Sequence, residues 1–170
     1  MLPGSAASAQ VSRGSARLDL SAPLSFADGI CHFSPSLDRA LSGMLSWDES
    51  RQRFIARTVR IGPMSLHPAL TVGPPEGGGR LYRSSVQLPA PARWNGLTLI
   101  GLGAAAGYEY RQRELRFANS PAATRAQLRR LGTELPAPPA SRSIPTDGCA
   151  ASIGIESRGS GSALVCTGWC

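Results

Sequence analysis

The chain has 170 residues, 42% of them hydrophobic and 17% charged, which predicts one globular domain that folds without a metal or dense cross-linking. Its formal net charge is +7 and every one of the 18 basic residues is arginine, so chemistry that needs a lysine Schiff base, a P-loop lysine or a Ser-Lys dyad is excluded. No apolar run approaches the roughly eighteen residues of a transmembrane helix.

The first ten residues, MLPGSAASAQ, are uncharged and rich in small side chains. Ala7-Ser8-Ala9 followed by Gln10 is typical of a signal-peptidase site, so we expect 1–10 to be a signal-peptide remnant and the mature chain to start near Gln10. A disordered terminus is the alternative, since it has the same composition. Residues 11–170 are then expected to form a single α+β domain.

The first regular elements are a strand and a helix. Alternating leucines and phenylalanine predict a strand over residues 17–26. Ser34-Pro35 supplies a capping hydroxyl and a proline for the first helical position. Apolar residues then follow at helical spacing, which predicts an amphipathic helix whose buried stripe is Leu37, Ala40, Leu41, Met44 and Leu45.

A series of short strands follows. The alternation of apolar and polar residues predicts strands over 53–61, 64–72, 81–88 and 97–102. Three segments rich in glycine and proline are predicted turns between them: Gly62-Pro63, GPPEGGG and PAPARWNG. Residues 108–118 are another strand candidate, although the polar middle of that segment also suits a turn. This succession predicts an antiparallel sheet.

The segment TLIGLGAAAGYEY, residues 98–110, has the G-x-G-x-x-(G/A) outline of a dinucleotide-binding turn. A true fingerprint opens the first βαβ unit, whereas here strand-like sequence precedes the glycines and no helical stripe or acidic ribose ligand follows. We therefore interpret the small residues as structural, in a strand that bends or that another element approaches closely.

A second helix is predicted from Ser120-Pro121 to Leu131, with Gly132 as its C-terminal cap. The next segment, PAPPASRSIP, is expected to be a stiff connector. The two Ser-Pro helix starts lie 86 residues apart and share an Arg-Ala pair, which raises the possibility of two duplicated helix-plus-sheet modules. Coincidence is the simpler explanation, because Ser-Pro is a common way to open a helix.

Four cysteines suggest two disulfides in an exported chain. Residues 149–166 have the pattern of a β-hairpin that turns at Arg158–Gly161, so we expect Cys149 to bond either Cys166 or Cys170. The other of these two cysteines is then left for Cys31, which would tie the two ends of the domain together. The spacing of Cys166 and Cys170 is not that of a zinc site.

Catalytic patterns are weak. The two histidines, His32 and His67, have no nucleophile motif near them, and Cys31-His32 cannot readily form a dyad because adjacent strand residues point to opposite faces. A pair of carboxylates cannot be identified from spacing alone, and Asp48-Glu49 suits a turn. Two groups of arginines raise nucleic acid as a partner, but their alternation favours solvated strand faces: Arg51, Arg53, Arg57, Arg60 and Arg111, Arg113, Arg116.

The sequence thus predicts an α+β fold with a curved antiparallel sheet and two helices packed on one face. The favoured function is an exported, periplasmic or secreted binding or inhibitor-like protein that uses no cofactor and no metal. Its partner is expected to be another protein or an envelope component, bound through a concave sheet surface. Aromatic and arginine side chains dominate such interfaces, and the candidates are Trp47, Trp94, Arg93, Tyr108 and Tyr110.

Two other functions stay open. One is a small periplasmic hydrolase that uses acidic residues or His67, and the other is a structural protein of the cell envelope.

Overall fold

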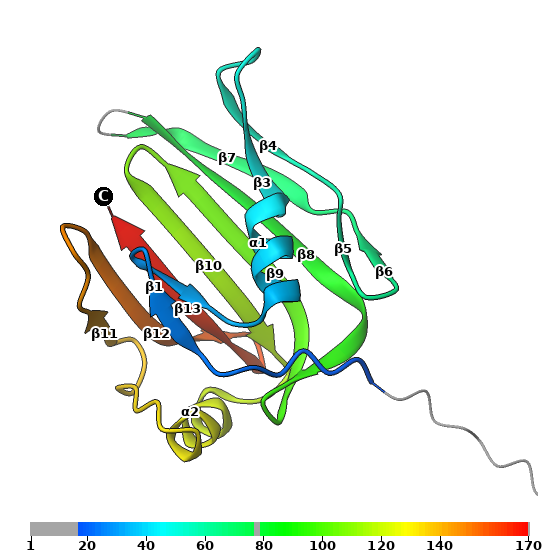
Figure 1. Cartoon of the computed structure of the whole chain (residues 1–170), viewed down its shortest axis with the longest axis vertical. Coiled ribbons are helices and arrows are strands. Elements are labelled where there is room, and N and C mark those ends of the chain that lie inside the picture. Colours follow the sequence, from blue (N-terminus) through cyan, green and yellow to red (C-terminus); the bar gives the residue numbers. More distant parts are fainter. Residues whose placement is uncertain (1–16, 77–78, 170) are drawn as a thin grey trace, which may run out of the picture.

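A seven-stranded antiparallel sheet forms the body of the protein in a computed structural model, which describes residues 17–76 and 79–169. The strand order is β11-β12-β13-β10-β9-β8-β7. In Figure 1, α1 crosses one face of this sheet and α2 lies at one end of it. This is the predicted α+β architecture, and the elements are β7 (Ala69–Glu76), β8 (Gly79–Trp94), β9 (Leu97–Gly107), β10 (Tyr110–Phe117), β11 (Ser141–Ile144), β12 (Ala150–Arg158), β13 (Gly161–Trp169), α1 (Pro35–Met44) and α2 (Pro121–Arg130).

Both helices begin where the sequence predicts. The Ser34 hydroxyl accepts a hydrogen bond from the Leu37 amide, and the Ser120 hydroxyl accepts one from Ala123, each with proline at the start of the helix. The predicted stripe of α1 is buried from Leu37 to Met44. After α2 the chain leaves the helix at Gly132, whose φ is +87°.

Both helices contact the same face of the sheet. Ser84 of β8 and Arg113 of β10 hydrogen-bond to residues of α1, so their side chains define what we call the α1 face. On β13, the side chains of Ser162 and Cys166 point to the same face, because they are four residues apart in one strand. Cys166 is bonded to Cys31, in the segment before α1, so this is the α1 face. The Ser162 hydroxyl lies 2.7 Å from the hydroxyl of Thr124 in α2. The prediction of two helices on one face is confirmed.

Three small hairpins cover further parts of the α1 face or project beside it. They are β1 (Ser25–Ala27) with β2 (Ile30–His32), β3 (Leu45–Asp48) with β4 (Arg53–Ala56), and β5 (Val59–Ile61) with β6 (Met64–Leu66). The predicted strands 53–61 and 64–72 are therefore each divided in two. The strand predicted over 17–26 is mostly extended chain, with one isolated bridge from Asp19 to Arg93 before β1. The alternation of apolar and polar residues predicts which segments are extended. It does not predict where an extended segment leaves one neighbouring strand and pairs with another.

One predicted turn is shorter than expected. The first six residues of the segment PAPARWNG belong to β8, which continues to Trp94. Pro89 and Pro91 fall between Gln87 and Ala92, where the pairing with β9 shifts register and no ladder amide is needed. The reversal comes at Asn95-Gly96, where both residues have positive φ. The strand candidate 108–118 is confirmed as β10, and its polar middle, residues 111–114, is not a turn.

The sheet does not divide into two similar modules. After α1 the chain makes two separate two-stranded sheets before it enters β7, whereas after α2 it makes three strands of the main sheet. The shared Ser-Pro openings therefore precede different structures, and the duplicated arrangement is absent from the described part of the chain.

One disulfide joins Cys31 of β2 to Cys166 of β13, with the two Cα atoms 6.0 Å apart. This confirms one of the two predicted partners of Cys31. Cys149 is also disulfide-bonded, at the open end of the confirmed β12–β13 hairpin. Cys170, its predicted partner, lies outside the described residues, as does the expected signal remnant 1–10. Neither helix in the described ranges is long and apolar enough to cross a membrane.

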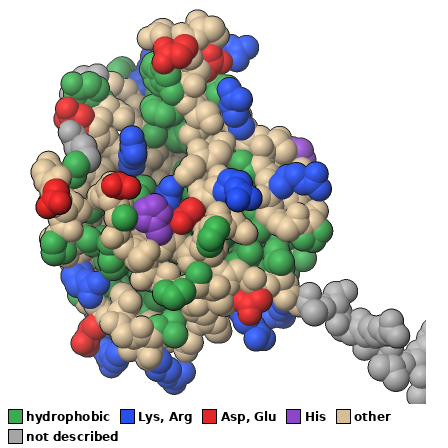
Figure 2. Space-filling model, in the orientation of Figure 1, with side chains coloured by type: hydrophobic (Ala, Val, Ile, Leu, Met, Phe, Trp, Pro, Cys, Tyr) green, Lys and Arg blue, Asp and Glu red, His purple; other side chains and the backbone are tan. Residues whose placement is uncertain are grey.

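The arginines behave differently in the two groups. Arg51, Arg53, Arg57 and Arg60 are exposed, as predicted for solvated positions. The second group, however, is divided between the faces of the sheet, and the Arg113 side chain is only 12% exposed because it bonds to α1. Figure 2 shows arginine side chains scattered over this side of the molecule, with no continuous basic stripe.

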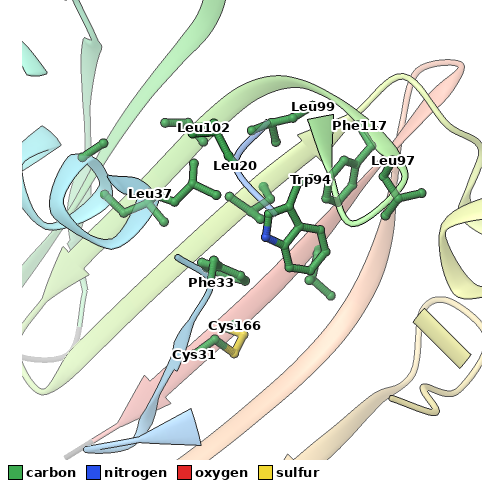
Figure 3. Packing of buried hydrophobic residues seen from close by; sticks show 14 of the residues in the cluster. Leu20, Cys31, Phe33, Leu37, Trp94, Leu97, Leu99, Leu102, Phe117 and Cys166 are labelled. Atoms are coloured by element: carbon green, nitrogen blue, oxygen red, sulfur yellow. A yellow bond between two sulfur atoms is a disulfide. The ribbon is translucent and has the colours of Figure 1, made fainter. Parts of the chain in front are cut away.

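The core is centred on Trp94, which is completely buried. Its ring stacks on Phe117 with centroids 5.8 Å apart and meets the edge of Phe33 at 5.9 Å. Figure 3 shows leucines of β9 and α1 around these rings, with the Cys31–Cys166 bond beside Phe33. The indole Nε1–H has no hydrogen-bond partner, so packing alone holds this ring in place.

Candidate functional site

Side-chain size changes along the α1 face of the sheet. On β9, Leu99 and Leu102 are fully buried, but the next two residues that point to this face are Ala104 and Ala106. Across the sheet, Arg111 pairs with both Ala106 of β9 and Gly168 of β13. The α1 face is therefore filled by large side chains at one end and floored by small ones at the other.

A hollow of about 600 Å³ lies above this floor of small residues. Leu41 and Leu45 at the end of α1 form one wall, and Ile30 of β2 forms another. Trp47 and Phe54 of the β3–β4 hairpin close the opposite side. Figure 1 shows this hairpin projecting beyond the sheet, and Figure 2 shows hydrophobic side chains beneath it. Its volume is within the range of small-molecule binding sites. We call it the open-end hollow.

The aromatic wall is a chain of ring contacts. Trp47 meets Phe54 edge-on at 5.1 Å between centroids, and Phe54 meets Tyr82 of β8 at 5.5 Å. The indole of Trp47 is nevertheless 43% exposed. Large, rigid and partly exposed aromatic rings are the side chains that most often anchor a bound partner.

Two arginines from β10 line the hollow, and only one of them is engaged. The guanidinium of Arg113 donates to the carbonyl of Cys31 at 3.0 Å, to Asp38 at 3.2 Å and to the hydroxyl of Ser42 at 2.7 Å. The side chain of Arg111 is exposed and makes no hydrogen bond or ion pair with residues 17–76 or 79–169. Burial lowers the pKa of Arg113, and the charge of Arg111 lowers it further, while Asp38 opposes both.

A histidine is linked to the same carboxylate. His32 Nδ1 lies 3.1 Å from Asp38, and its Nε2 is buried without a hydrogen-bond partner. No described hydroxyl or thiol hydrogen-bonds to this ring, and Cys31 is held in the disulfide. The pair therefore lacks the nucleophile that a catalytic triad requires.

His67, the other catalytic candidate, is exposed, and its Nδ1 lies 3.1 Å from the hydroxyl of Thr58. It does not line the open-end hollow. Within the described ranges, no group of three or more His, Cys, Asp or Glu side chains is placed to hold a metal ion. The acidic residues that line the hollow, Asp28 and Glu109, lie in two different turns.

The five predicted binding residues are not brought together. Trp47 and Tyr110 line the open-end hollow, and Tyr108 is 76% exposed in the neighbouring β9–β10 turn. Trp94 is part of the core, so its inclusion in the site is corrected: a fully buried ring offers no surface to a partner. Arg93 is exposed but pairs with Thr98, at the far end of β8 from the hollow.

Tyr110 also belongs to the opposite face of the sheet. Its hydroxyl donates to Gln112, its ring meets Trp169 edge-on at 6.0 Å, and burial raises the pKa of the phenol. With Tyr108 and Arg83 it lines a second, shallower hollow of about 410 Å³. Trp47 and Phe54, which form the aromatic wall of the open-end hollow, do not line this second hollow.

The glycines of the segment 98–110 are explained by that opposite face. Glu114 is only 5% exposed and lies across β9, where a Cβ on Gly103 would be 3.2 Å from both its Cβ and its Oε2. Its carboxylate accepts hydrogen bonds from Arg116 at 2.7 Å and Arg158 at 3.1 Å. The prediction that small residues here allow close approach agrees with this packing.

The sequence reasoning missed Arg111, Phe54 and the alanine floor. A signal for the floor is present in residues 97–107, where one face of the strand changes from leucine to alanine. Reading it requires the register of β9 with β8 and β10, because the irregularity near Leu99 shifts the alternation. Comparisons with protein-family models, curated proteins and solved structures found no match to this chain.

Proposed function

We propose that this chain is a small exported binding protein that acts, without a cofactor, through the open-end hollow on the α1 face of its sheet. The observation that carries the proposal is the change from large to small side chains along one face. A protein with no ligand gains stability by filling that space, since each buried methylene contributes about 0.8 kcal/mol. Here the space has a floor of alanine and glycine and a lining of both apolar and charged side chains, and it is left open.

The lining is suited to recognition. Exposed Trp47 and partly buried Phe54 offer apolar area on one side, and aliphatic residues of α1 and β2 offer it on the other. Exposed aromatic rings around a concavity of this size are typical of ligand sites. The partner class expected from the sequence, an envelope component or a protein segment, is compatible with such a surface.

Export is supported by the Cys31–Cys166 disulfide, because structural disulfides persist in oxidising compartments. The signal-peptidase pattern at Ala7-Ser8-Ala9 points the same way. The hydrolase alternative finds less support, since His67 lies outside the lining and the two acidic residues of the hollow lie in different turns.

The test is binding of a neutral apolar fluorophore, N-phenyl-1-naphthylamine, to the oxidised full chain. We expect saturable binding that Ala106→Phe abolishes, because the new ring occupies the floor of the hollow. The matched control is Ala69→Phe, the same substitution at an exposed strand position outside the lining. Equal binding by both variants and the parent chain would disprove the proposal, as would no binding to the parent chain.

A further inference from the structure

We propose that the ligand of the open-end hollow is an amphiphile with a single anionic group, and that this group binds Arg111. The inference rests on the proposed function and adds the chemical class of the ligand. It is argued from the charges that surround an apolar floor.

Arg111 lines the hollow beside its floor of small residues. It stands on β10 opposite Ala106 on one side and Gly168 on the other, so neighbouring strands present no side chain large enough to cover it. Arg111 is two residues from Arg113 in the same strand, so their side chains point to the same face. Since Arg113 bonds to α1, both guanidinium groups lie on the α1 face. A ligand that entered the hollow would meet Arg111 beside the alanine floor.

The side chain of Arg111 has no ion-pair partner within the described ranges. Asp38 is used by Arg113, by the amide of Phe33 and by His32, and it makes no ion pair with Arg111. The charge of Arg111 also lowers the pKa of Arg113. The guanidinium of Arg111 therefore keeps its donors free for an anionic group of a ligand.

The acidic residues of the lining limit the ligand to one anionic group. Asp28 and Glu109 both have positive φ in the tips of hairpin turns, at +53° and +58°, and both are exposed. Neither forms an ion pair with Arg111. A ligand with several negative charges would meet these two carboxylates at the rim, whereas one compact anionic group can reach Arg111 between them.

The rest of the ligand must be apolar. Ile30, Leu41, Leu45, Trp47 and Phe54 surround the space next to Arg111 and present no strong hydrogen-bonding group beyond the indole N–H. An alkyl chain or a flat ring system would cover these side chains while its carboxylate, sulfate or phosphate group stayed at Arg111. A chain with a charged end is therefore favoured over a sugar or a polar peptide.

The test compares three probes of equal chain length: decanoate, decanol and decyltrimethylammonium. Each is titrated into the oxidised full chain and its dissociation constant measured by calorimetry and by displacement of N-phenyl-1-naphthylamine. We expect decanoate to bind at least about tenfold more tightly than decanol, because one charge-assisted hydrogen bond contributes a gain in affinity of this size. The cationic probe should bind most weakly.

The variant Arg111→Gln should raise the dissociation constant of decanoate about tenfold and leave that of decanol unchanged, so that the preference for decanoate is lost. Arg60→Gln, at an exposed arginine outside the lining, is the matched control and should change neither. Equal affinity for decanoate and decanol, or a preference for the cation, would overturn this inference and leave the proposed function intact. Failure of the parent chain to bind any of the three probes or the fluorophore would overturn both.

Discussion

The two ends of the α1 face share strands, helix and disulfide, yet one end is solid and the other hollow. At the closed end, β8, β9 and β10 contribute Trp94, Leu99 and Phe117, all without measurable exposure. At the open end the same strands contribute Tyr82, Ala106 and Arg111, and none of these is buried. The same three strands pair at both ends, although their register shifts between them, and the large side chains of one end are replaced by small or exposed ones at the other.

The aromatic residues are divided in the same way. Phe33, Trp94 and Phe117 pack together inside the closed end. At the open end the rings are only partly buried and contact one another in pairs, namely Trp47 with Phe54 and Phe54 with Tyr82. The first group is buried in the core, and we propose the second as part of a binding surface, which leads to predictions of decreasing size.

The largest effect is expected where the two ends meet. Cys166 stands beside Arg113, in the row where the strands change from large to small residues, and its bond to Cys31 spans a separation of 135 residues. The double variant Cys31→Ser with Cys166→Ser should lose about 4–5 kcal/mol of unfolding free energy by the chain-entropy model. Urea denaturation measures this. A loss below about 1 kcal/mol would show that β2 is held by packing and not by the cross-link.

The second effect belongs to the closed end. Trp94→Ala should cost about 3–5 kcal/mol, as expected for a large aromatic side chain removed from a core. Trp94→Phe should cost much less, because the indole N–H that it removes has no hydrogen-bond partner. Thermal or urea unfolding of the pair checks this, and equal losses would mean that the indole nitrogen is bonded in solution.

A third substitution replaces a large residue of the closed end by alanine, the residue that floors the open end. Leu102 is fully buried and adjoins Ala104, so Leu102→Ala extends the alanine floor by one position. We expect a loss of about 2–5 kcal/mol, toward the lower end if the new space opens into the hollow and admits water. Titration with N-phenyl-1-naphthylamine should show that the variant still binds. Loss of binding without loss of stability would contradict the division between the two ends.

The smallest effect on stability is expected at the open end. Trp47→Ala removes a 43% exposed ring and should cost no more than about 1 kcal/mol. The same change should weaken probe binding several-fold, because half of the aromatic wall is lost. A large fall in melting temperature with unchanged probe binding would reverse the roles that we assign to the two ends.

Local signals in the sequence were sufficient for part of this fold. The Ser-Pro openings of both helices, the glycine after α2 and the β12–β13 hairpin depend on residues within a few positions of one another. The link between Cys31 and a tail cysteine also followed, because the hairpin left one cysteine for it. These features are set by capping, turn geometry and cysteine number, which neighbours in the chain decide.

The division into two ends could not be predicted, because it depends on pairing across strands. Trp94 follows a proline-rich segment that resembles a loop, and only the register shift in β8 brings it into the core. Arg111 and Arg116 look alike in the sequence but lie on opposite faces of the sheet, where one is uncompensated and the other bonds Glu114. Trp47 and Trp94 both stand beside a turn, yet Trp47 is 43% exposed at the hollow and Trp94 is fully buried, a difference that the local sequence does not reveal.

The Cys31–Cys166 bond also has a mechanical consequence. A tension applied through the segments that flank these two cysteines would pass from β2 to β13 across the sulfur atoms. The 135 residues of sequence separation between them, which include β7 to β12 and both helices, would carry none of it. At about 3.3–3.6 Å per extended residue, some 450 Å of chain is withheld from stretching until the bond is reduced. The same covalent link therefore makes the length of the protein under load a function of its redox state.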